Sequence, residues 1–519
     1  DKKKRKLFAA RDRLGIKPLY YYYDGRRIIF ASEIKAILED PSIPRVPNYQ
    51  ALADYIFANR PLGAKSMFEN INEVEPGYMV TVDPQKRDVK VKKYWDLEFN
   101  YNTSRSLDDV KEELFFLLDD AVKVHCRSDA PLGCHLSGGM DTSIVTVLAA
   151  KYRDNMNTFS IKFSDEPYID ETKYAKAVAS KAGTRYQEGY PSAANMATLL
   201  PILQWHMDAP MATDGGFSYF TVSNLARESV KVTLTGHGGD EVFAGYPAQF
   251  YASYNTTGMF KQAEDPNRVI SVSQANNVIE KLFQKGFKGI YKSVKNRLFT
   301  GKESLEDLWI KLHCGILPED NVILQKSFIN SLKGYSPRDD YVKPLKENNA
   351  GNTLDKCLYH DLRVYLPGLL HLEDRASMAL SLESRVPLID YRIVEFLATV
   401  PPEQKVVGLK PKYLLREIGS SLLPDMVRKR EDKSGFVVPG KFWFTPEVKD
   451  FVKNILLSPD SLNRGVFKRK FLEAAYEAPS DLLTWNIINI ELWFKIFIDR
   501  DPNWTSKTGL ENLPSIHKS

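Results

Sequence analysis

The chain has 519 residues, which is too long for one ordinary hydrophobic core and predicts two or more domains. Its 71 basic and 66 acidic residues leave a net charge of only +5, so the charge gives no general case for nucleic-acid binding. A hydrophobic fraction of 43% with 26% charged residues excludes a disordered or fibrous chain.

Cysteine usage and the N-terminus give hints about location. Cys126, Cys134, Cys314 and Cys357 have no CxxC spacing, which argues against a disulfide framework or a zinc site and favours a reducing cytoplasm. No stretch approaches the roughly 20 apolar residues of a membrane helix, so we expect no membrane partner. The chain begins with Asp1, lacks a secretory hydrophobic region and enters a strand-like pattern at once, so we expect that it has been cut.

The first hundred residues predict a β-rich segment. Short aromatic and β-branched runs predict strands over 6–10, 19–23, 27–31 and 78–82, and one helix is expected over 49–57. Asp24-Gly25 is a hairpin signal. From Leu107 onward the apolar residues recur at the spacing of a helix, and Ser106 followed by Asp109 resembles a capping box at its start. We therefore expect one domain over 1–103 and a second over 104–519.

Strands and helices alternate in the second domain. Strands are predicted over 132–136, 158–163 and 230–234, with helices over 142–152 and 171–181. This alternation predicts an α/β fold in which helices flank a parallel sheet.

The string SGGMDTS at 137–143 lies between a predicted strand and a predicted helix. Glycines let the backbone approach an anion, and a helix N-terminus favours phosphate. Hydroxyl donors could come from Ser137, Thr142 and Ser143, while Asp141 suits a magnesium ligand that bridges phosphate oxygens. The alternative is a plain turn in which Asp141 caps the helix.

Residues 136–143 resemble the SGGxDS pyrophosphate loop of the ATP pyrophosphatase superfamily, which typically cleaves ATP to AMP and pyrophosphate. Further strings resemble glutamine-hydrolysing asparagine synthetases in family order: TFSIKF at 158–163, TGHGGDEVFAGY at 235–246, EDRASMA at 373–379 with ESRVPLID at 383–390, KPKYLLR at 410–416 and KSGF at 433–436. In the first domain, RDRLGIKPLY at 11–20 and FASEIKA at 30–36 look like the last third of the family's glutaminase domain.

The resemblance implies a nucleotide-hydrolase-like synthetase domain, preceded by a partial glutaminase domain of the N-terminal-nucleophile type. It implies a carbon–nitrogen ligase that makes β-aspartyl-AMP from aspartate and ATP, releases pyrophosphate, and forms asparagine with nitrogen from glutamine or ammonia. The implied cofactors are ATP and Mg²⁺, the implied partners are small molecules, and a homodimer is compatible with the family. The nucleophilic cysteine of family glutaminases is not in this sequence, so we expect the chain as given not to hydrolyse glutamine; truncation and natural loss both stay open.

The resemblance also implies roles for individual residues. Asp141 and Asp240 would hold magnesium, Lys412 would stabilise the developing oxyanion, and Glu373 or Asp374 could accept a proton from the attacking ammonium. The ATP contacts would be Leu136, Ser137, Gly138, Gly139, Asp141, Thr142, Ser143, Ile161, Thr235 and Gly236.

His237 departs from the family pattern, because related synthetases commonly carry Glu or Asp there. An imidazole with an ordinary pKa of about 6.5 could act as a base for ammonia, although it would not attract an ammonium ion. Two alternatives therefore stay open. One is a related amidotransferase acting on another carboxylic acid, such as a sugar acid, a peptide or a cell-wall precursor. The other is a non-catalytic regulatory or scaffold protein that only binds ATP.

Overall fold

A computed structural model describes residues 1, 3, 5–86, 88–163, 170–257, 304–315, 323–407, 410–430, 438, 442, 445–477, 482–514 and 517–518. The KSGF string at 433–436 lies outside these residues. Among the helices of the described ranges, none is long and apolar enough to cross a membrane.

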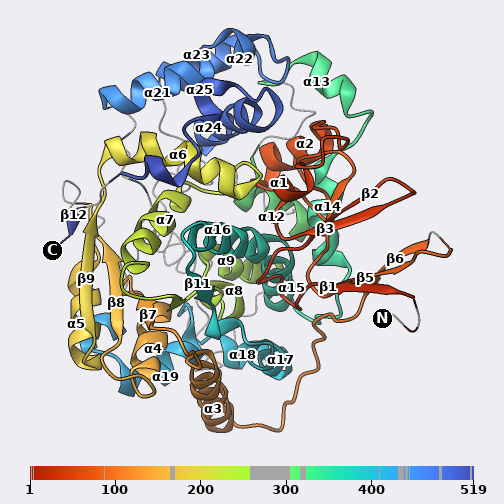
Figure 1. Ribbon diagram of the computed structural model, residues 1–519. Helices are drawn as coiled ribbons and strands as arrows, with labels where there is room; N and C mark the ends of the chain where they lie inside the picture. The colour runs from red at the N-terminus through yellow and green to blue at the C-terminus, as the bar shows by residue number, and fades with distance from the viewer. Residues whose placement is uncertain are drawn as a thin grey trace.

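The N-terminal segment, drawn in red in Figure 1, contains two antiparallel sheets of three strands, ordered β1-β5-β6 and β3-β2-β4. Its strands are β1 (Leu7–Ala10), β2 (Tyr20–Tyr23), β3 (Ile28–Ala31), β4 (Ile71–Glu73), β5 (Tyr78–Asp83) and β6 (Asp88–Lys93), and its helices are α1 (Ile34–Ile37) and α2 (Tyr49–Ala58). The predicted β-rich character is confirmed. The hairpin at Asp24-Gly25 joins β2 to β3, and Gly25 adopts φ +85° there.

A six-stranded sheet follows, in the order β11-β10-β7-β8-β9-β12. Its strands are β7 (Leu132–His135), β8 (Asn157–Ile161), β9 (Arg185–Tyr190), β10 (Val232–Leu234), β11 (Glu383–Arg385) and β12 (His517–Lys518). The first five pair in parallel and only β12 is antiparallel. The expected α/β fold with a parallel sheet is confirmed.

Helices cover the sheet and extend beyond it (Figure 1). The described helices of the middle of the chain are α3 (Leu107–His125), α4 (Met140–Ala149), α5 (Thr172–Ala182), α6 (Ala193–Met207), α7 (Gly215–Ala226), α8 (Gly239–Val242), α9 (Pro247–Thr257), α12 (Leu305–His313), α13 (Lys326–Ser331), α14 (Pro337–Lys346), α15 (Thr353–His360), η4 (Asp361–Tyr365) and α16 (Leu366–Met378). Those after β11 are η5 (Pro387–Ile389), α17 (Tyr391–Thr399), α18 (Pro402–Lys405), α19 (Tyr413–Leu422), α20 (Asp425–Arg428), α21 (Pro446–Leu456), α22 (Pro459–Asn463), α23 (Arg469–Glu477), α24 (Leu482–Trp493), η7 (Phe494–Ile498), α25 (Pro502–Thr505) and η8 (Leu510–Asn512).

The start of α3 shows how local sequence sets an element. The Ser106 side chain accepts a hydrogen bond from the Asp109 backbone N–H, and the Asp109 carboxylate accepts one from the Ser106 N–H. This confirms the predicted capping box, which satisfies amide donors that the first turn leaves free. Residues 94–106, between β6 and α3, contain neither helix nor strand.

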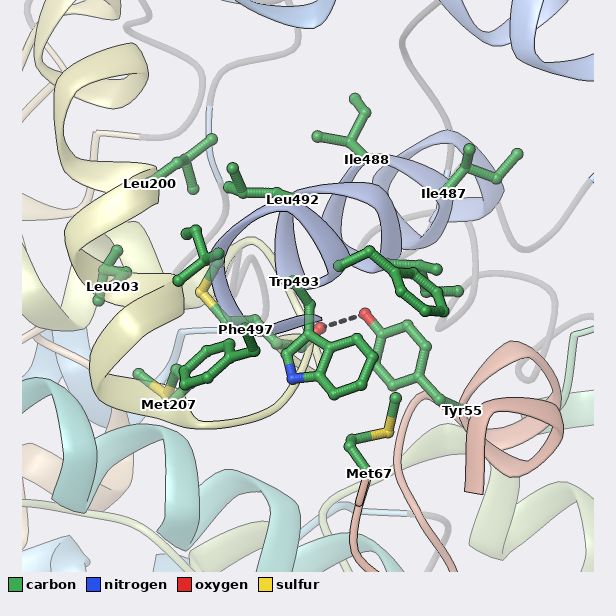
Figure 2. Close-up of a cluster of buried hydrophobic side chains, with 14 of the residues drawn as sticks. Tyr55, Met67, Leu200, Leu203, Met207, Ile487, Ile488, Leu492, Trp493 and Phe497 are labelled. Carbon is green, nitrogen blue, oxygen red and sulfur yellow. Dashed lines mark hydrogen bonds between the residues drawn. The ribbon is translucent and has the colours of Figure 1, made fainter. Parts of the chain in front are cut away.

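One large hydrophobic cluster joins the N-terminal segment to the last helices of the chain. Figure 2 shows Tyr55 of α2, Met207 of α6 and Trp493 of α24 around a common centre. The Tyr55 hydroxyl donates to the Met211 carbonyl at 2.6 Å, and the Trp493 indole donates to the Asp208 carbonyl at 3.0 Å. Because burying one large apolar side chain contributes about 1.5–3 kcal/mol, this cluster fixes the N-terminal segment against α6 and α24.

Candidate active site

A tight strand-to-helix turn joins β7 to α4 over residues 136–139. Gly138 adopts φ +77°, a conformation that favours glycine. A Cβ on Gly138 would lie 2.6 Å from both Tyr174 Cβ and Ala175 N, so α5 closes one side of the turn. Both backbone conformation and space therefore require glycine at this position.

The first turn of α4 carries backbone N–H groups whose acceptors must lie outside the helix. Its first intrahelical bond runs from Ser143 N–H to the Gly139 carbonyl, at 3.0 Å. The N–H groups of Met140, Asp141 and Thr142 therefore have no acceptor within the helix, and they lie at the positive end of its dipole. This arrangement suits an anion such as a phosphate.

The loop hydroxyls occupy different positions. Ser137 Oγ lies 3.1 Å from Thr142 Oγ1 and accepts from Gly139 N–H at 3.3 Å, so these two side chains brace the turn. Ser143 is fully buried, and its hydroxyl has no hydrogen-bond partner in the part of the chain that the structure describes.

The loop that follows β10 packs directly against the first one. A Cβ on Gly236 would lie 2.7 Å from Thr142 N, and a Cβ on Gly239 would lie 2.5 Å from Asp141 Cγ. Thr235 is joined to β11 by a 2.9 Å bond from its N–H to the Arg385 carbonyl. The structure thus brings the two predicted nucleotide loops together, with Asp141 between them. Ile161 ends β8, the strand beside β7.

Lys412 closes the site from a distant part of the sequence. Its Nζ contacts Asp141 Oδ2 and lies 2.7 Å from Asp240 Oδ1, and only 6% of the residue is exposed. Its backbone is left-handed with φ +57°, and its N–H donates to the carbonyl of Ala244, itself at φ +55°, over 3.0 Å. Such conformations in non-glycine residues cost free energy and are concentrated at functional sites.

Asp141 and Asp240 direct carboxylate oxygens toward one point, where the Lys412 ammonium lies. Oxygen ligands of this kind suit Mg²⁺, which commonly uses one or two carboxylates and completes its shell with phosphate oxygens and water. Within the described ranges, no group of three or more His, Cys, Asp and Glu side chains is arranged to hold a metal. The two carboxylates therefore fit a metal carried in with a nucleotide, not a cage made by protein alone.

His237 lies beside this site. Its Nδ1 is 3.0 Å from Thr235 Oγ1, and its ring centroid is 5.0 Å from that of Tyr219 on α7. Burial, together with the charge of His237, lowers the pKa of His135 to about 3. The two imidazoles are thus electrostatically coupled, and His135 is neutral at pH 7.

Glu373 and Asp374 are neighbours on α16 but have different contacts. Glu373 is 2% exposed, accepts a 2.7 Å hydrogen bond from Ser384 Oγ and lies 3.6 Å from His135 Nδ1. Burial raises the pKa of Glu373 to about 7. Asp374 instead pairs with Lys17 of the N-terminal segment, at 2.6 Å. Glu373 therefore faces the sheet and Asp374 the segment.

His135 and Ser384 were missed by sequence reasoning. The signal for His135 was a titratable side chain at the end of a short strand whose other members are small or apolar. Ser384 had no local signal, because its role depends on α16 packing over β11.

Comparison with known proteins gives matches over both parts of the chain. The model of the asparagine synthase family matches residues 113–495, and that of the glutamine amidotransferase domain matches residues 1–95.

Individual relatives are distant. The chain is 28% identical to asparagine synthetase [glutamine-hydrolyzing] 1 of Bacillus subtilis over 503 residues, covering 95% of this chain and 76% of that protein. It is 38% identical to putative asparagine synthetase [glutamine-hydrolyzing] 2 of Methanocaldococcus jannaschii over 250 residues, 47% of this chain and 48% of that protein. It is also 25% identical to the amidase chyE of Penicillium rubens over 485 residues, covering 85% of this chain and 69% of that protein.

Proposed function

We propose, on the premise that this chain belongs to the asparagine synthase family, that it uses ATP to activate the side-chain carboxylate of aspartate and converts it into the amide of asparagine. The observation that carries the proposal is the position of Lys412 Nζ between Asp141 and Asp240, at the N-terminus of α4. Cations and amide donors gathered in one place suit a reaction that accumulates negative charge on phosphate.

The first step would join aspartate to the nucleotide. A carboxylate oxygen attacks the α-phosphorus of ATP, the bond from that phosphorus to the bridging oxygen breaks, and pyrophosphate leaves. We place the departing phosphates on the amides of Met140, Asp141 and Thr142, with the adenine beside the backbone at Leu136 and Ile161. Ser137, Gly138 and Gly139 hold the turn in shape, and Ser143, Thr235 and Gly236 complete the proposed nucleotide contacts.

We assign magnesium binding to Asp141 and Asp240, where the ion would neutralise phosphate oxygens. With an ion on the two carboxylates, Lys412 would turn its ammonium toward the oxygens that gain charge. Its left-handed backbone, held by the bond to the Ala244 carbonyl, fixes where that ammonium can reach. Lys412 thus supplies charge stabilisation without transferring a proton.

The second step would use ammonia. Its nitrogen attacks the carbonyl carbon of β-aspartyl-AMP, the carbon–oxygen bond to AMP breaks, and the nitrogen loses a proton. We assign His237 as the base that accepts this proton. In a longer protein, glutamine would supply the nitrogen, in keeping with the glutamine amidotransferase match over residues 1–95.

The test is product analysis with ATP, Mg²⁺ and aspartate, in the presence and absence of ammonia. The proposal predicts AMP and pyrophosphate in equal amounts, dependent on aspartate, and asparagine only when ammonia is present. Formation of ADP and phosphate, or ATP cleavage that ignores the acid, would overturn it. Binding of ATP with no turnover under any acid would instead favour a regulatory or scaffold role.

A second candidate is amidation of a different carboxylic acid. It is favoured by His237, which stands where the family commonly has a carboxylate, and by the similarity to a protein named as an amidase. Pyrophosphate release with a panel of sugar acids, peptides and cell-wall precursors separates the two, since the same loop would adenylate either acid.

Further expectations accompany this function. We propose that the chain divides into domains 1–103 and 104–519. We also propose that the protein is located in the cytoplasm, where the thiols of Cys126, Cys134, Cys314 and Cys357 would stay reduced. A homodimer stays a prediction.

A further inference from the structure

A buried acid–imidazole pair lies beneath the site, between the sheet and α16. Glu373 Oε1 is 3.6 Å from His135 Nδ1, and the two residues are 2% and 3% exposed. Ser384 Oγ donates to the same carboxylate oxygen at 2.7 Å and so fixes its orientation. A carboxyl group and an imidazole this far from solvent carry a large desolvation cost, which makes a purely accidental pairing costly.

Each member of the pair also has one polar atom that makes no hydrogen bond among the described residues. Glu373 Oε2 and His135 Nε2 are buried and have no hydrogen-bond partner among the residues that the structure describes. Leaving such an atom unpaired costs free energy of folding. Buried groups that the fold leaves unsatisfied at this cost are candidates for contact with a bound molecule or a transferred proton.

The pair is connected to the active site through His237. His135 ends β7, and His237 follows the neighbouring strand β10, whose residues pair with β7. Thr235, the residue after β10, has its hydroxyl 3.0 Å from His237 Nδ1, and the charge of His237 helps to lower the pKa of His135. Amide formation requires a base that accepts the proton lost by the attacking nitrogen. A neutral imidazole can accept that proton, but the resulting imidazolium then needs a nearby negative charge.

We propose that Glu373 and His135 are positioning residues for amide formation, which orient His237 and stabilise the positive charge that it gains on accepting the proton from the nitrogen nucleophile. This inference rests on the proposed function. The proton moves from nitrogen to an imidazole nitrogen of His237 as the carbon–nitrogen bond forms and AMP departs. The negative charge required is that of the Glu373 carboxylate, which lies 3.6 Å from His135.

The charges around Glu373 predict how the step depends on pH. Burial and the neighbouring Asp374 favour its protonated form, whereas the Lys17 ammonium from the N-terminal segment and the Ser384 hydroxyl favour the carboxylate. His135 faces it from β7, and His135 is in turn affected by His237. Amide formation should therefore rise with pH through about 7, as Glu373 becomes ionised.

The experiment measures both half-reactions over pH 5.5–9 on the full chain, with aspartate and ammonia, and expresses the rate of amide formation per concentration of free NH3. Glu373→Gln keeps the shape of the side chain and removes a buried charge, so it should fold. We expect its aspartate-dependent pyrophosphate release to stay within about twofold of wild type. Amide formation should fall about 10²-fold, the lower end of the range for acid–base assistance, and should lose the rise near pH 7. Glu347→Gln, the same change on an exposed side chain, is the matched control.

Lys17→Met gives an independent test, because Lys17 lies outside the proposed catalytic groups. Its loss removes a charge that lowers the pKa of Glu373, so the rise in amide formation should move to higher pH. A merely structural role would not shift this midpoint.

Each negative outcome has a distinct meaning. Wild-type protein without aspartate-dependent pyrophosphate release would refute the proposed function itself. Normal pyrophosphate release, together with an unchanged rate and pH profile of amide formation in Glu373→Gln, would overturn the positioning role alone. Equal loss of both half-reactions in Glu373→Gln would also overturn it, since that pattern is expected of a structural residue.

Discussion

Lys412 Nζ lies 2.7 Å from Asp240 Oδ1 although 172 positions of sequence separate the two residues, and the same ammonium contacts Asp141. The contact places one cation between the two loops that the proposed reaction requires. Removing the lysine therefore leaves two carboxylates facing one another without their counter-charge.

The first prediction concerns this lysine. Lys412→Met should lower aspartate-dependent pyrophosphate release about 10²–10³-fold, the effect of removing one group that stabilises developing negative charge. Lys410→Met, on the exposed side of the same loop, is the matched control and should stay near the wild-type rate. If Lys412→Met released pyrophosphate as fast as Lys410→Met, the role given to Lys412 would be wrong.

The second prediction concerns the turn. Gly138→Ala and Gly183→Ala both place a side chain at positive φ, at +77° and +66°, which costs about 1–2 kcal/mol. A Cβ on Gly183 meets nothing within 4 Å, whereas one on Gly138 meets Tyr174 and Ala175 at 2.6 Å. Overpacking should therefore destabilise the folded state by about a further 1–3 kcal/mol in Gly138→Ala but not in Gly183→Ala. Denaturant unfolding and ATP titration check this, and equal effects of the two changes would contradict the tight turn.

The third prediction concerns His237. Because His237 is assigned to the ammonia step and not to adenylation, His237→Ala should spare aspartate-dependent pyrophosphate release more than it spares asparagine formation. Both are measured on the same samples. Equal loss of the two activities would remove His237 from the second step.

The fourth prediction concerns pH and the N-terminal segment. Burial raises the pKa of Asp54 from 3.8 to about 6, against the opposing effect of Lys65. The folded state therefore holds a proton that the unfolded state releases between these pH values, and stability from this group is complete below pH 3.8 and is lost as pH rises through 6. The free energy of unfolding should fall by about 3 kcal/mol once Asp54 is ionised in both states.

Asp54→Asn isolates that contribution, because the amide cannot ionise. Wild type and variant are unfolded in urea at several pH values, and their difference in unfolding free energy should move in favour of the variant between pH 4 and pH 7. A difference that stays constant over this interval would show that folding does not raise the pKa of Asp54.

Local pattern predicted much of the fold. The apolar runs at 132–136 and 158–163 predicted strands close to β7 and β8, and the helical period from Leu107 predicted α3. The helix α4 begins only two residues before its predicted start. The strand β9 was not predicted, because its sequence RYQEGY is polar and lacks a run of β-branched residues. The three-residue β11 is too short to have a period.

The site was predictable only in part, because its assembly depends on long-range packing. The family resemblance indicated Asp141, Asp240 and Lys412, but their meeting at one ammonium required the fold of α19 against α4. The pairing of Glu373 with His135 depends on α16 lying over the sheet, and no spacing in the sequence encodes it. The roles of these residues remain predictions.

The central claim, that an acid is joined to the α-phosphorus of ATP in this site, is tested most directly with aspartate carrying ¹⁸O in its side-chain carboxylate. The protein is incubated with this aspartate, ATP, Mg²⁺ and ammonia, the products are separated, and the ¹⁸O content of each is measured by mass spectrometry. We predict one ¹⁸O atom in AMP for each asparagine formed, with none in pyrophosphate. Label in inorganic phosphate, or unlabelled AMP, would contradict adenylation of the acid.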